Sequence, residues 1–508
     1  MLLNYFVVAF RNIKNNLVFS CLNSLCLSVG MACCLVVFLL AYQEYTYETQ
    51  HEKVDRIYRI VNRQTEGTKL SVVAFSQGLL APELAKNFAE VEEATRVGFI
   101  QSDVLVDDKA PEKQRIMAVD PSYFKIFTIP FKQLPGRDTL EMDGVLISEK
   151  AAVRLFGKKN PIGERVTIND IHLKVSGVFE DFTLKSNLIT DFIISFAWIE
   201  KTDSKAQLWN YNSYYNYVLM PETFDKQAFH AKMNEFIHRF TPASWKSYEY
   251  FLQPIRMINL HAGVIGNPRG TIGKIIVHGF VTLGVIILLL ASFNYMNMAT
   301  ARSARRVIEV GIRKVVGAQR SQLVRQFLAE SFVLCGIGFF MAILWADLAL
   351  QFFNHYTGFG LSLNTFFGDV ELVCWLIGAF LLITIGSGVY PAFFLSRFMP
   401  AAILKGRRSS KAGSKIRRGL VIFQFALTST LVVMVIIVHK QVKHLRSIDV
   451  GYNTEQLLLF TADRNKEVTI ESFKAELLKL PGVKQISVTS NFPSGRASST
   501  SVWESGKA

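Results

Sequence analysis

The chain has 508 residues, half of them apolar, a formal net charge of +15 and a mean hydropathy of +0.25. A soluble protein of this length would spread its apolar residues over several domains, whereas here they are gathered into long runs. This distribution excludes an ordinary soluble protein. Five runs of roughly 18 residues or more are long enough to cross a hydrocarbon core, and none contains Lys or Arg. They cover residues 18–42, 275–296, 327–350, 372–395 and 420–438. The sequence therefore predicts an α-helical polytopic membrane protein with five transmembrane helices.

The positive charge indicates membrane orientation and requires no nucleic acid as a partner. Loops 297–326 and 397–419 are rich in Lys and Arg, whereas loop 351–370 contains neither. Because Lys and Arg concentrate in cytoplasmic loops, this alternation predicts an N-terminus in the cytoplasm. Residues 43–274, 351–370 and 439–508 then lie outside the cytoplasm.

The N-terminal half is predicted to be an interfacial helix, a first span and a large external domain. Residues 1–17 place apolar side chains between Arg11, Asn12 and Lys14, as in a helix that lies in the membrane interface. After the span over residues 18–42, residues 43–274 have the alternation of a mixed α/β extracytoplasmic domain. The signals predict a strand over 55–62, a helix over 76–88, a strand and helix over 145–156, two strands over 165–180 joined at 169–170, and a strand pair over 209–220.

The second half alternates spans with short loops and then repeats the N-terminal layout. A membrane domain over residues 275–406 is predicted to contain spans 275–296, 327–350 and 372–395, with a basic loop at 297–326. It is followed by a basic cytoplasmic linker at 407–419, a fifth span at 420–438, and the start of a second external domain at 439–508 with a helix over 471–480 and a strand over 483–489. Because this second repeat has no return span, we expect 508 residues to be a truncated product or a fragment of a longer chain.

Residues that could support catalysis or metal binding are scattered in the sequence. The phosphate-binding pattern G-x-x-x-x-G-K-[ST] and the nucleophile pattern G-x-S-x-G are both absent, and the nine histidines show no ligand spacing. All six cysteines fall within predicted spans, so no disulfide or thiolate metal site is expected outside the membrane. We predict no catalytic residues, no metal site and no cofactor bound by this chain.

Two acidic residues lie in the third predicted span, Glu330 about one turn from its start and Asp347 near its end. An acid inside a membrane is a functional candidate by default. Both positions are close to an interface, so local pairing is favoured over a transport pathway. Glu330 is expected to form an interfacial ion pair with an arginine of the preceding basic loop.

The most informative stretch of the sequence is the basic loop between the second and third spans. Ile308, Ile312, Val315 and Val316 recur at the spacing of one helical face among Arg and Lys residues. Gly317 provides a helix stop, and Ser321 a cap for the next helix. The pattern predicts a short amphipathic helix at the membrane surface. Two interpretations remain open: a topology-setting loop that touches anionic lipid, or a surface that docks a protein partner.

The same stretch resembles the signature of FtsX/MacB-type ABC transporter permeases. The resemblance rests on Glu309–Ala318 and Phe327–Ser331 in the membrane domain, and on Val119–Phe124 and Asn160–Gly163 in the external domain. It identifies 43–274 as a MacB-like periplasmic core domain and 275–406 as an FtsX-like permease domain of the long two-repeat form.

The resemblance implies a function that suits the charge pattern. The basic loop would form a coupling helix that docks on a separate cytoplasmic ABC ATPase dimer, which binds and hydrolyses the ATP, so this chain is not itself an enzyme. The coupling residues are Glu309, Val310, Gly311, Ile312, Arg313, Lys314, Gly317 and Ala318. The family also implies a multi-pass protein of the bacterial inner membrane, with the large domain in the periplasm. The two halves would pair within the full-length chain, or two copies would form a homodimer.

Two functions from different classes follow from this resemblance. In the first, the chain is the membrane subunit of an ABC-type export or mechanotransmission complex, with a periplasmic adaptor or outer-membrane factor as a further partner. In the second, it does not transport and instead regulates a periplasmic cell-wall hydrolase by the same ATP-driven movement. A neighbouring gene for an adaptor would favour export, and one for a hydrolase would favour regulation. The sequence does not choose the cargo.

Overall fold

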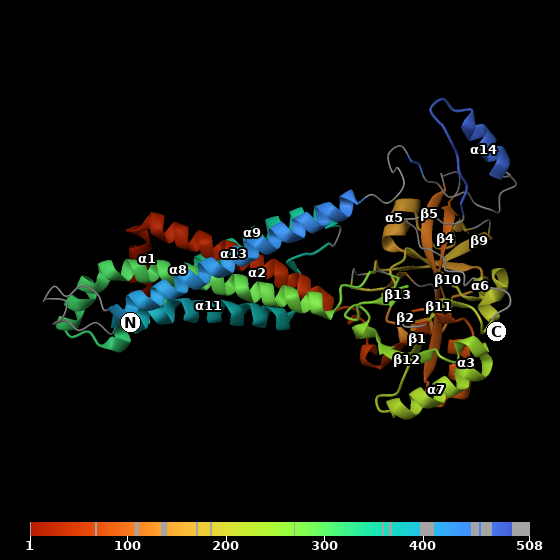
Figure 1. The fold of residues 1–508 in the computed structure, drawn as a ribbon, viewed down its shortest axis with the longest axis horizontal. Helices are drawn as coiled ribbons and strands as arrows, with labels where there is room; N and C mark the ends of the chain where they lie inside the picture. The colour runs from red at the N-terminus through yellow and green to blue at the C-terminus, as the bar shows by residue number, and fades with distance from the viewer. Residues whose placement is uncertain are drawn as a thin grey trace. The chain divides into compact units, whose positions relative to one another are not determined.

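The computed structural model describes most of the chain as membrane-length helices and one mixed α/β domain (Figure 1). The described residues are 2–66, 69–106, 111–133, 140–168, 171–182, 185–268, 270–357, 360–364, 368–396, 411–448, 457–458 and 470–489. Residues 1–427 and residues 428–508 form two compact units. The long helices are α1 (Leu2–Lys14), α2 (Leu17–Tyr45), α8 (Lys274–Val315), α9 (Arg320–Thr357), α11 (Val370–Ser396) and α13 (Lys411–Ser447).

The helices occupy the places of the predicted spans. Among the described residues, four segments are long and apolar enough to cross a membrane, namely 17–45, 274–299, 320–357 and 418–447. The remaining predicted span, 372–395, corresponds to α11, which contains a shorter apolar helical segment over Val370–Gly386. In lipid each backbone amide must find its partner within the chain, so helices are the form that such apolar runs take.

The bundle core forms where α2 packs between α8 and α9, with α11 against α9 and α8 and α1 against α9. Close approach depends on small residues. A Cβ atom at Gly30 of α2 would lie 2.5 Å from the Cβ of Ala291 in α8, and Gly338 of α9 faces Leu27. Leu27 and Cys335 are almost completely buried at this crossing. Small side chains allow neighbouring backbones to pack tightly where lipid offers little hydrophobic driving force.

The basic loop predicted at 297–326 is largely a continuation of its flanking helices. α8 runs without interruption to Val315, so the predicted short surface helix is the last part of a 42-residue helix. The reason is local: the segment 274–315 contains no proline, and its first residue in a left-handed conformation beyond the helix is Gly317, with φ 102°. Ser321 is not the cap, because α9 already begins at Arg320. The linker predicted at 407–419 is likewise helical from residue 411, where α13 begins.

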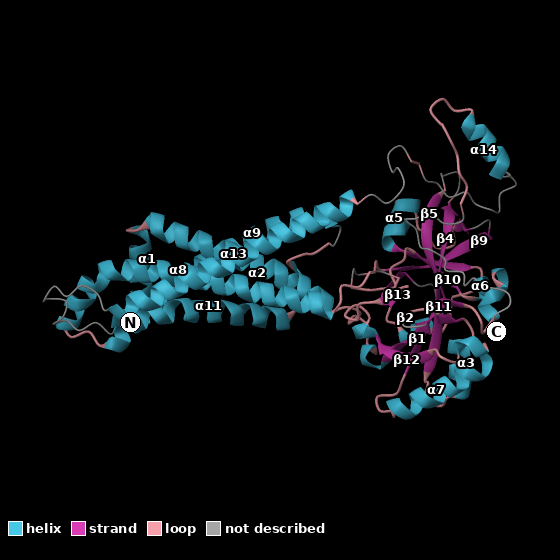
Figure 2. Cartoon of the chain, viewed as in Figure 1, coloured by secondary structure: helices cyan, strands magenta, loops and turns pink. Residues whose placement is uncertain are grey.

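The external domain is built on one mixed sheet, shown as magenta arrows in Figure 2. The described residues form thirteen strands, in the order β13-β2-β1-β11-β4-β5-β10-β7-β9-β6, with β12 on β1, β3 on β11, and β8 on β4 and β9. Their bounds are β1 (Ile57–Glu66), β2 (Lys69–Val73), β3 (Ser76–Gln77), β4 (Glu93–Leu105), β5 (Glu112–Val119), β6 (Phe131–Gln133), β7 (Gly144–Ser148), β8 (Arg165–Ile168), β9 (Ile171–Phe179), β10 (Phe192–Ser195), β11 (Asn212–Leu219), β12 (Glu249–Pro254) and β13 (Val264–Ile265).

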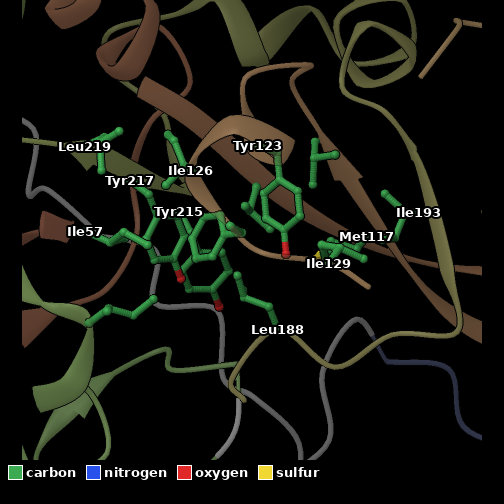
Figure 3. Close-up of a cluster of buried hydrophobic side chains, with 14 of the residues drawn as sticks. Ile57, Met117, Tyr123, Ile126, Ile129, Leu188, Ile193, Tyr215, Tyr217 and Leu219 are labelled. Atoms are coloured by element: carbon green, nitrogen blue, oxygen red, sulfur yellow. The ribbon is translucent and has the colours of Figure 1, made fainter. Parts of the chain in front are cut away.

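Three hydrophobic clusters hold this sheet to its helices. The helices are α3 (Leu80–Asn87), α4 (Tyr123–Ile126), α5 (Glu149–Phe156), α6 (Ala197–Thr202) and α7 (Lys226–Phe240). One cluster joins α3 and α7 to β1 and β12, and a second joins α5 and α6 to β7, β9 and β10. The central cluster gathers Tyr123, Tyr217 and Met117 from α4, β11 and β5 (Figure 3). Burial of these side chains is the main favourable term for the domain.

Most predicted elements of the external domain are confirmed, with shifted bounds. The strand at 55–62 is β1, the strand and helix at 145–156 are β7 and α5, and the two strands at 165–180 are β8 and β9, while the joining residues 169–170 lie outside the described residues. The helix predicted at 76–88 begins only at Leu80, because residues 76–77 pair with β11. The pair predicted at 209–220 is a single strand, β11, whose partners come from elsewhere in the chain.

The last described segment contains the expected helix but no strand. α14 (Ile470–Leu478) matches the helix predicted at 471–480. Residues 483–489 are described without regular structure, so the predicted strand there is wrong. Strand alternation gives a strand only where a partner edge accepts its hydrogen bonds.

The packing of α2 against α8 gives a test with a matched control. Gly30→Ala should lower the free energy of unfolding of the membrane bundle by about 1–3 kcal/mol relative to Gly336→Ala, because the added methyl group overpacks the crossing. A Cβ atom at Gly336 would meet nothing within 4 Å, so both variants share the same gain in helix propensity. Thermal unfolding of the purified protein in detergent measures the difference. Equal midpoints would contradict the close packing of Gly30 on Ala291.

Candidate functional site

The candidate site is the turn that joins α8 to α9, here called the α8–α9 tip and comprising residues 312–319. Its backbone forms two hydrogen bonds that close a helix end around a left-handed residue. The amide of Ala318 donates to the carbonyl of Arg313 at 2.9 Å, and the amide of Gly317 donates to that of Lys314 at 3.1 Å. Glycine suits the positive φ of 102° at position 317, since no Cβ opposes it. Gly317 therefore ends α8 as predicted and Ala318 belongs to the same backbone turn, while their predicted part in coupling stays a prediction.

The tip is held to the bundle by one face of α8. Val310 is buried against Leu323 and Phe327 of α9, with Val324 packed beside them. The opposite side of the helix end carries the apolar residues of the predicted amphipathic face. Ile312, Val315 and Val316 are 61%, 66% and 82% exposed. The tip thus has an internal apolar contact that fixes it and an external apolar surface that the described residues do not cover.

Basic side chains surround this exposed surface. The guanidinium of Arg313 donates to the Gln326 side-chain oxygen at 2.6 Å, which directs it back toward α9. Partial burial lowers the pKa of Lys314, and the nearby positive charge of Arg320 lowers it further. The tip is therefore an apolar patch within a concentration of positive charge.

A buried chain of polar contacts leads from the tip into the bundle. Gln326 accepts from Arg313 and donates to the Glu330 carboxylate at 3.3 Å, and the Asn12 amide of α1 donates to the same carboxylate at 2.9 Å. Glu330 and Gln326 are each 8% exposed. Gln326 thus connects Glu330 to Arg313, while the predicted ion pair of Glu330 with an arginine stays a prediction. Burying a carboxylate is costly unless hydrogen bonds satisfy its oxygens, and these contacts do so.

The remaining predicted residues have different surroundings. Asp347 is exposed on α9 and accepts from Gln351 one turn further along the same helix, at 2.8 Å. Glu309 and Gly311 lie within α8, but the burial and contacts of these two residues lie outside what the structure describes. Their predicted role in coupling stays a prediction. The sequence did not single out Gln326 or Asn12. A glutamine four residues before an intramembrane acid is a usable signal, whereas the position of Asn12 beside Glu330 depends on how α1 packs.

Other features of the described residues do not form a reaction centre. No group of three or more His, Cys, Asp or Glu side chains among them could hold a metal ion. A cavity of about 610 Å³ opens on the external domain, and its lining includes the apolar residues Phe124 and Phe131 and the charged residues Glu52, Lys53 and Lys125. The charged side chains of this cavity carry both signs, but they do not place a nucleophile beside a general base, as catalysis requires.

Two segments of the chain match known family models. Residues 20–236 match the MacB-like periplasmic core domain, and residues 281–400 match the FtsX-like permease C-terminal domain. The tip lies inside the second match.

Individual relatives carry consistent names. The chain is 29% identical over 194 residues to the uncharacterized ABC transporter permease YknZ of Bacillus subtilis (strain 168). The aligned region covers 38% of this chain and 45% of YknZ. The chain is 24% identical over 307 residues to the macrolide export ATP-binding/permease protein MacB of Rhodopirellula baltica, which covers 54% of this chain and 42% of MacB. The matches therefore span less than half the length of these relatives. The crystal structure of the periplasmic region of MacB from Actinobacillus actinomycetemcomitans aligns with 41% of this chain and 92% of that chain at 15% identity, with a TM-score of 0.32.

The polar chain at Glu330 gives a second prediction. Glu330→Ala should destabilise the bundle by about 1–3 kcal/mol, because Gln326 and Asn12 lose a buried acceptor. Asp347→Ala is the matched control, since it removes an exposed acid from the same helix and should change stability by less than about 0.5 kcal/mol. Thermal unfolding in detergent compares the two variants. A larger loss for the Asp347 variant would contradict the assignment of Glu330 as a buried structural acceptor.

Proposed function

Because this chain belongs to the ABC transporter permeases that join a MacB-like periplasmic core domain to an FtsX-like permease domain, we propose that it is the membrane subunit of an ABC-type export or mechanotransmission complex. A separate cytoplasmic ABC ATPase dimer binds and hydrolyses the ATP, and the α8–α9 tip docks on it. The chain itself then supplies no catalytic residue and binds no cofactor. Its role is to convert the movement of the ATPase into movement of the helices and of the external domain.

The observation that carries this proposal is the exposed apolar surface of the tip. Ile312, Val315 and Val316 lie at the end of α8, beyond the 274–299 segment that is apolar enough to cross the membrane. Contiguous exposed apolar side chains within a polar surround are typical of a protein interface. Arg313 and Lys314 beside them would steer an acidic groove toward the patch and set its orientation.

The construction of the tip supports its use for transmitting force. A docking element that bent on contact would absorb the movement of its partner. Here the left-handed turn at Gly317, the buried contact of Val310 with α9 and the bridge from Arg313 to Gln326 all resist bending. A push on the tip would pass into α8 and α9 together, and through α9 to α1 at Asn12.

Orientation and partners follow from the charge pattern. Lys and Arg concentrate around the tip and in residues 397–419, which supports a cytoplasmic tip, a cytoplasmic N-terminus and a periplasmic core domain in the bacterial inner membrane. Anionic lipid at that surface would assist docking of the basic flank. Export through an adaptor or outer-membrane factor and control of a periplasmic hydrolase would both use this transmission.

Photo-crosslinking tests the docking surface directly. A p-benzoylphenylalanine at Val316, introduced in native membranes, should yield an adduct with a protein that contains the G-x-x-x-x-G-K-[ST] pattern of an ATPase. The same reagent at Leu70, which is 62% exposed on β2 of the external domain, should not give that adduct. Mass spectrometry of the adducts identifies the partner. The same adduct at Leu70, or only lipid adducts at Val316, would contradict the proposal.

Substitution of the patch provides a quantitative version of this test. Val315→Asp combined with Val316→Asp should lower the yield of co-purified ATPase at least about tenfold, which corresponds to about 1.4 kcal/mol of binding free energy. Membrane insertion should be unchanged, because both residues lie outside the apolar part of α8. Leu70→Asp is the control for adding a charge at an exposed apolar position. Co-purification at wild-type yield in the double variant would exclude the tip as the docking site.

A further inference from the structure

A second buried carboxylate lies at the opposite end of the membrane helices, just beyond α2. Glu48 follows the last residue of that helix, Tyr45, by three positions, and its side chain is completely buried. Its φ of 59° is the one positive value of a non-glycine residue among the described residues. A side chain opposes this backbone conformation, so it persists only where the surroundings enforce it.

The contacts of Glu48 show what enforces it. One carboxylate oxygen accepts from the backbone amide of Asn187 at 2.6 Å and from the Ser186 hydroxyl at 3.2 Å. The other oxygen is 3.2 Å from the His51 Nε2 atom and 3.2 Å from the Gln50 amide nitrogen. The Glu48 amide itself donates to the carbonyl of Lys185 at 2.7 Å. A single residue therefore fastens the chain that leaves α2 to the 185–187 segment.

The histidine in this network connects it to the core of the external domain. The amide of Thr128 donates to His51 Nδ1 at 3.2 Å, so the proton of the neutral ring lies on Nε2 and faces Glu48. The His51 ring also packs edge-on against Phe127, with centroids 5.1 Å apart. Phe127 belongs to the same central cluster as Tyr123 and Tyr217 of Figure 3. Burial raises the pKa of Tyr123 well above its usual value, and the nearby charge of Glu48 adds to this shift.

The last turn of α2 and the residues just after it make further contacts with other segments. The Asn259 amide donates to the Glu44 carboxylate, and the Tyr47 hydroxyl donates to the Asn187 side chain at 3.4 Å. The Tyr42 hydroxyl donates to Asp369, which precedes α11. The end of α2 is thus connected both to the external domain and to the segment that leads into another membrane helix.

We propose that Glu48 is the positioning residue of a rigid joint that makes the external domain follow the movement of α2. A flexible linker would need neither a buried carboxylate with four hydrogen-bond contacts nor a left-handed residue held between two segments. The joint therefore has one conformation, and a displacement of α2 is passed to the 185–187 segment and the central cluster. The proposed function supplies the source of that displacement, but the stiffness of the joint does not depend on it.

The joint can be tested on the purified full chain in nanodiscs without any ATPase. Spin labels on p-acetylphenylalanine at Val29 of α2 and Val153 of α5, both exposed, report the distance between the helix and the domain while leaving the native cysteines untouched. Glu48→Ala should at least double the width of the distance distribution. Glu48→Gln should broaden it less, because one amide oxygen can still accept from Asn187 and Ser186. Hydrogen exchange in β4 and β5 should stay unchanged in both variants.

Glu52→Ala is the matched control. Glu52 is exposed on the same segment, and its backbone amide, which alanine retains, donates to Thr128 Oγ1 at 3.0 Å. This variant should keep the wild-type distribution. An unchanged width in Glu48→Ala would overturn the proposal, and so would faster exchange throughout β4 and β5 in both Glu48 variants, which would make Glu48 a folding residue of the domain. Failure of the ATPase to dock at the tip would leave this outcome unaffected.

Discussion

The structure depends on the continuity of α8. A helix of 42 residues is roughly 60 Å long, and each interior peptide group is hydrogen-bonded to the next turn. Its apolar part, residues 274–299, is long enough to cross the membrane, and its last turns extend beyond that part to the tip. Because the backbone is unbroken between them, a displacement at Val315 cannot be absorbed by a loop before it reaches the spans. Separate helices joined by a flexible connection would have the same charges and the same hydropathy, but they would not form one continuous rod.

Buried polar groups lie at the two ends of the membrane helices, where these helices contact other segments of the chain. At the tip, Gln326 links Arg313 to Glu330, and Asn12 brings α1 into the same network. Beyond α2, Glu48 holds the segment that contains Ser186 and Asn187. Apolar contacts are non-directional and tolerate sliding, whereas hydrogen bonds to a buried carboxylate require particular partners at particular distances. The two acids therefore determine geometry at the two ends of the membrane helices, and apolar packing provides most of the cohesion between them.

This division of roles agrees with the proposed function, in which the chain transmits movement and a partner ATPase supplies the chemistry. The tip combines an exposed apolar patch with basic neighbours, as expected of the docking surface proposed above. Its internal side is packed and hydrogen-bonded, so docking would not have to order it first. In the external domain, the buried cluster around Tyr123 forms a packed core. In the proposed joint, movement of α2 is passed to this core through Glu48. The same device would serve export or the control of an external enzyme, because neither needs a charged pathway through the bundle.

The sequence by itself determined the membrane class, the places of the spans, the mixed α/β character of residues 43–274 and the position of Gly317. These features follow from local composition: apolar run length, the period of alternation and the conformational freedom of one glycine. The motif around Glu309–Ala318 also identified the stretch that carries the candidate site. Local signals did not determine that α8 continues through this stretch, since a basic surface helix and the end of a long helix have the same periodicity. They also could not pair Glu330 with Asn12 across 318 positions, or Glu48 with Asn187 across 139. Only the tertiary structure determined the continuity of α8 and these two pairings. A buried polar group bonds to whichever partner lies close after the helices and strands have packed, and separation along the chain does not predict which one that is.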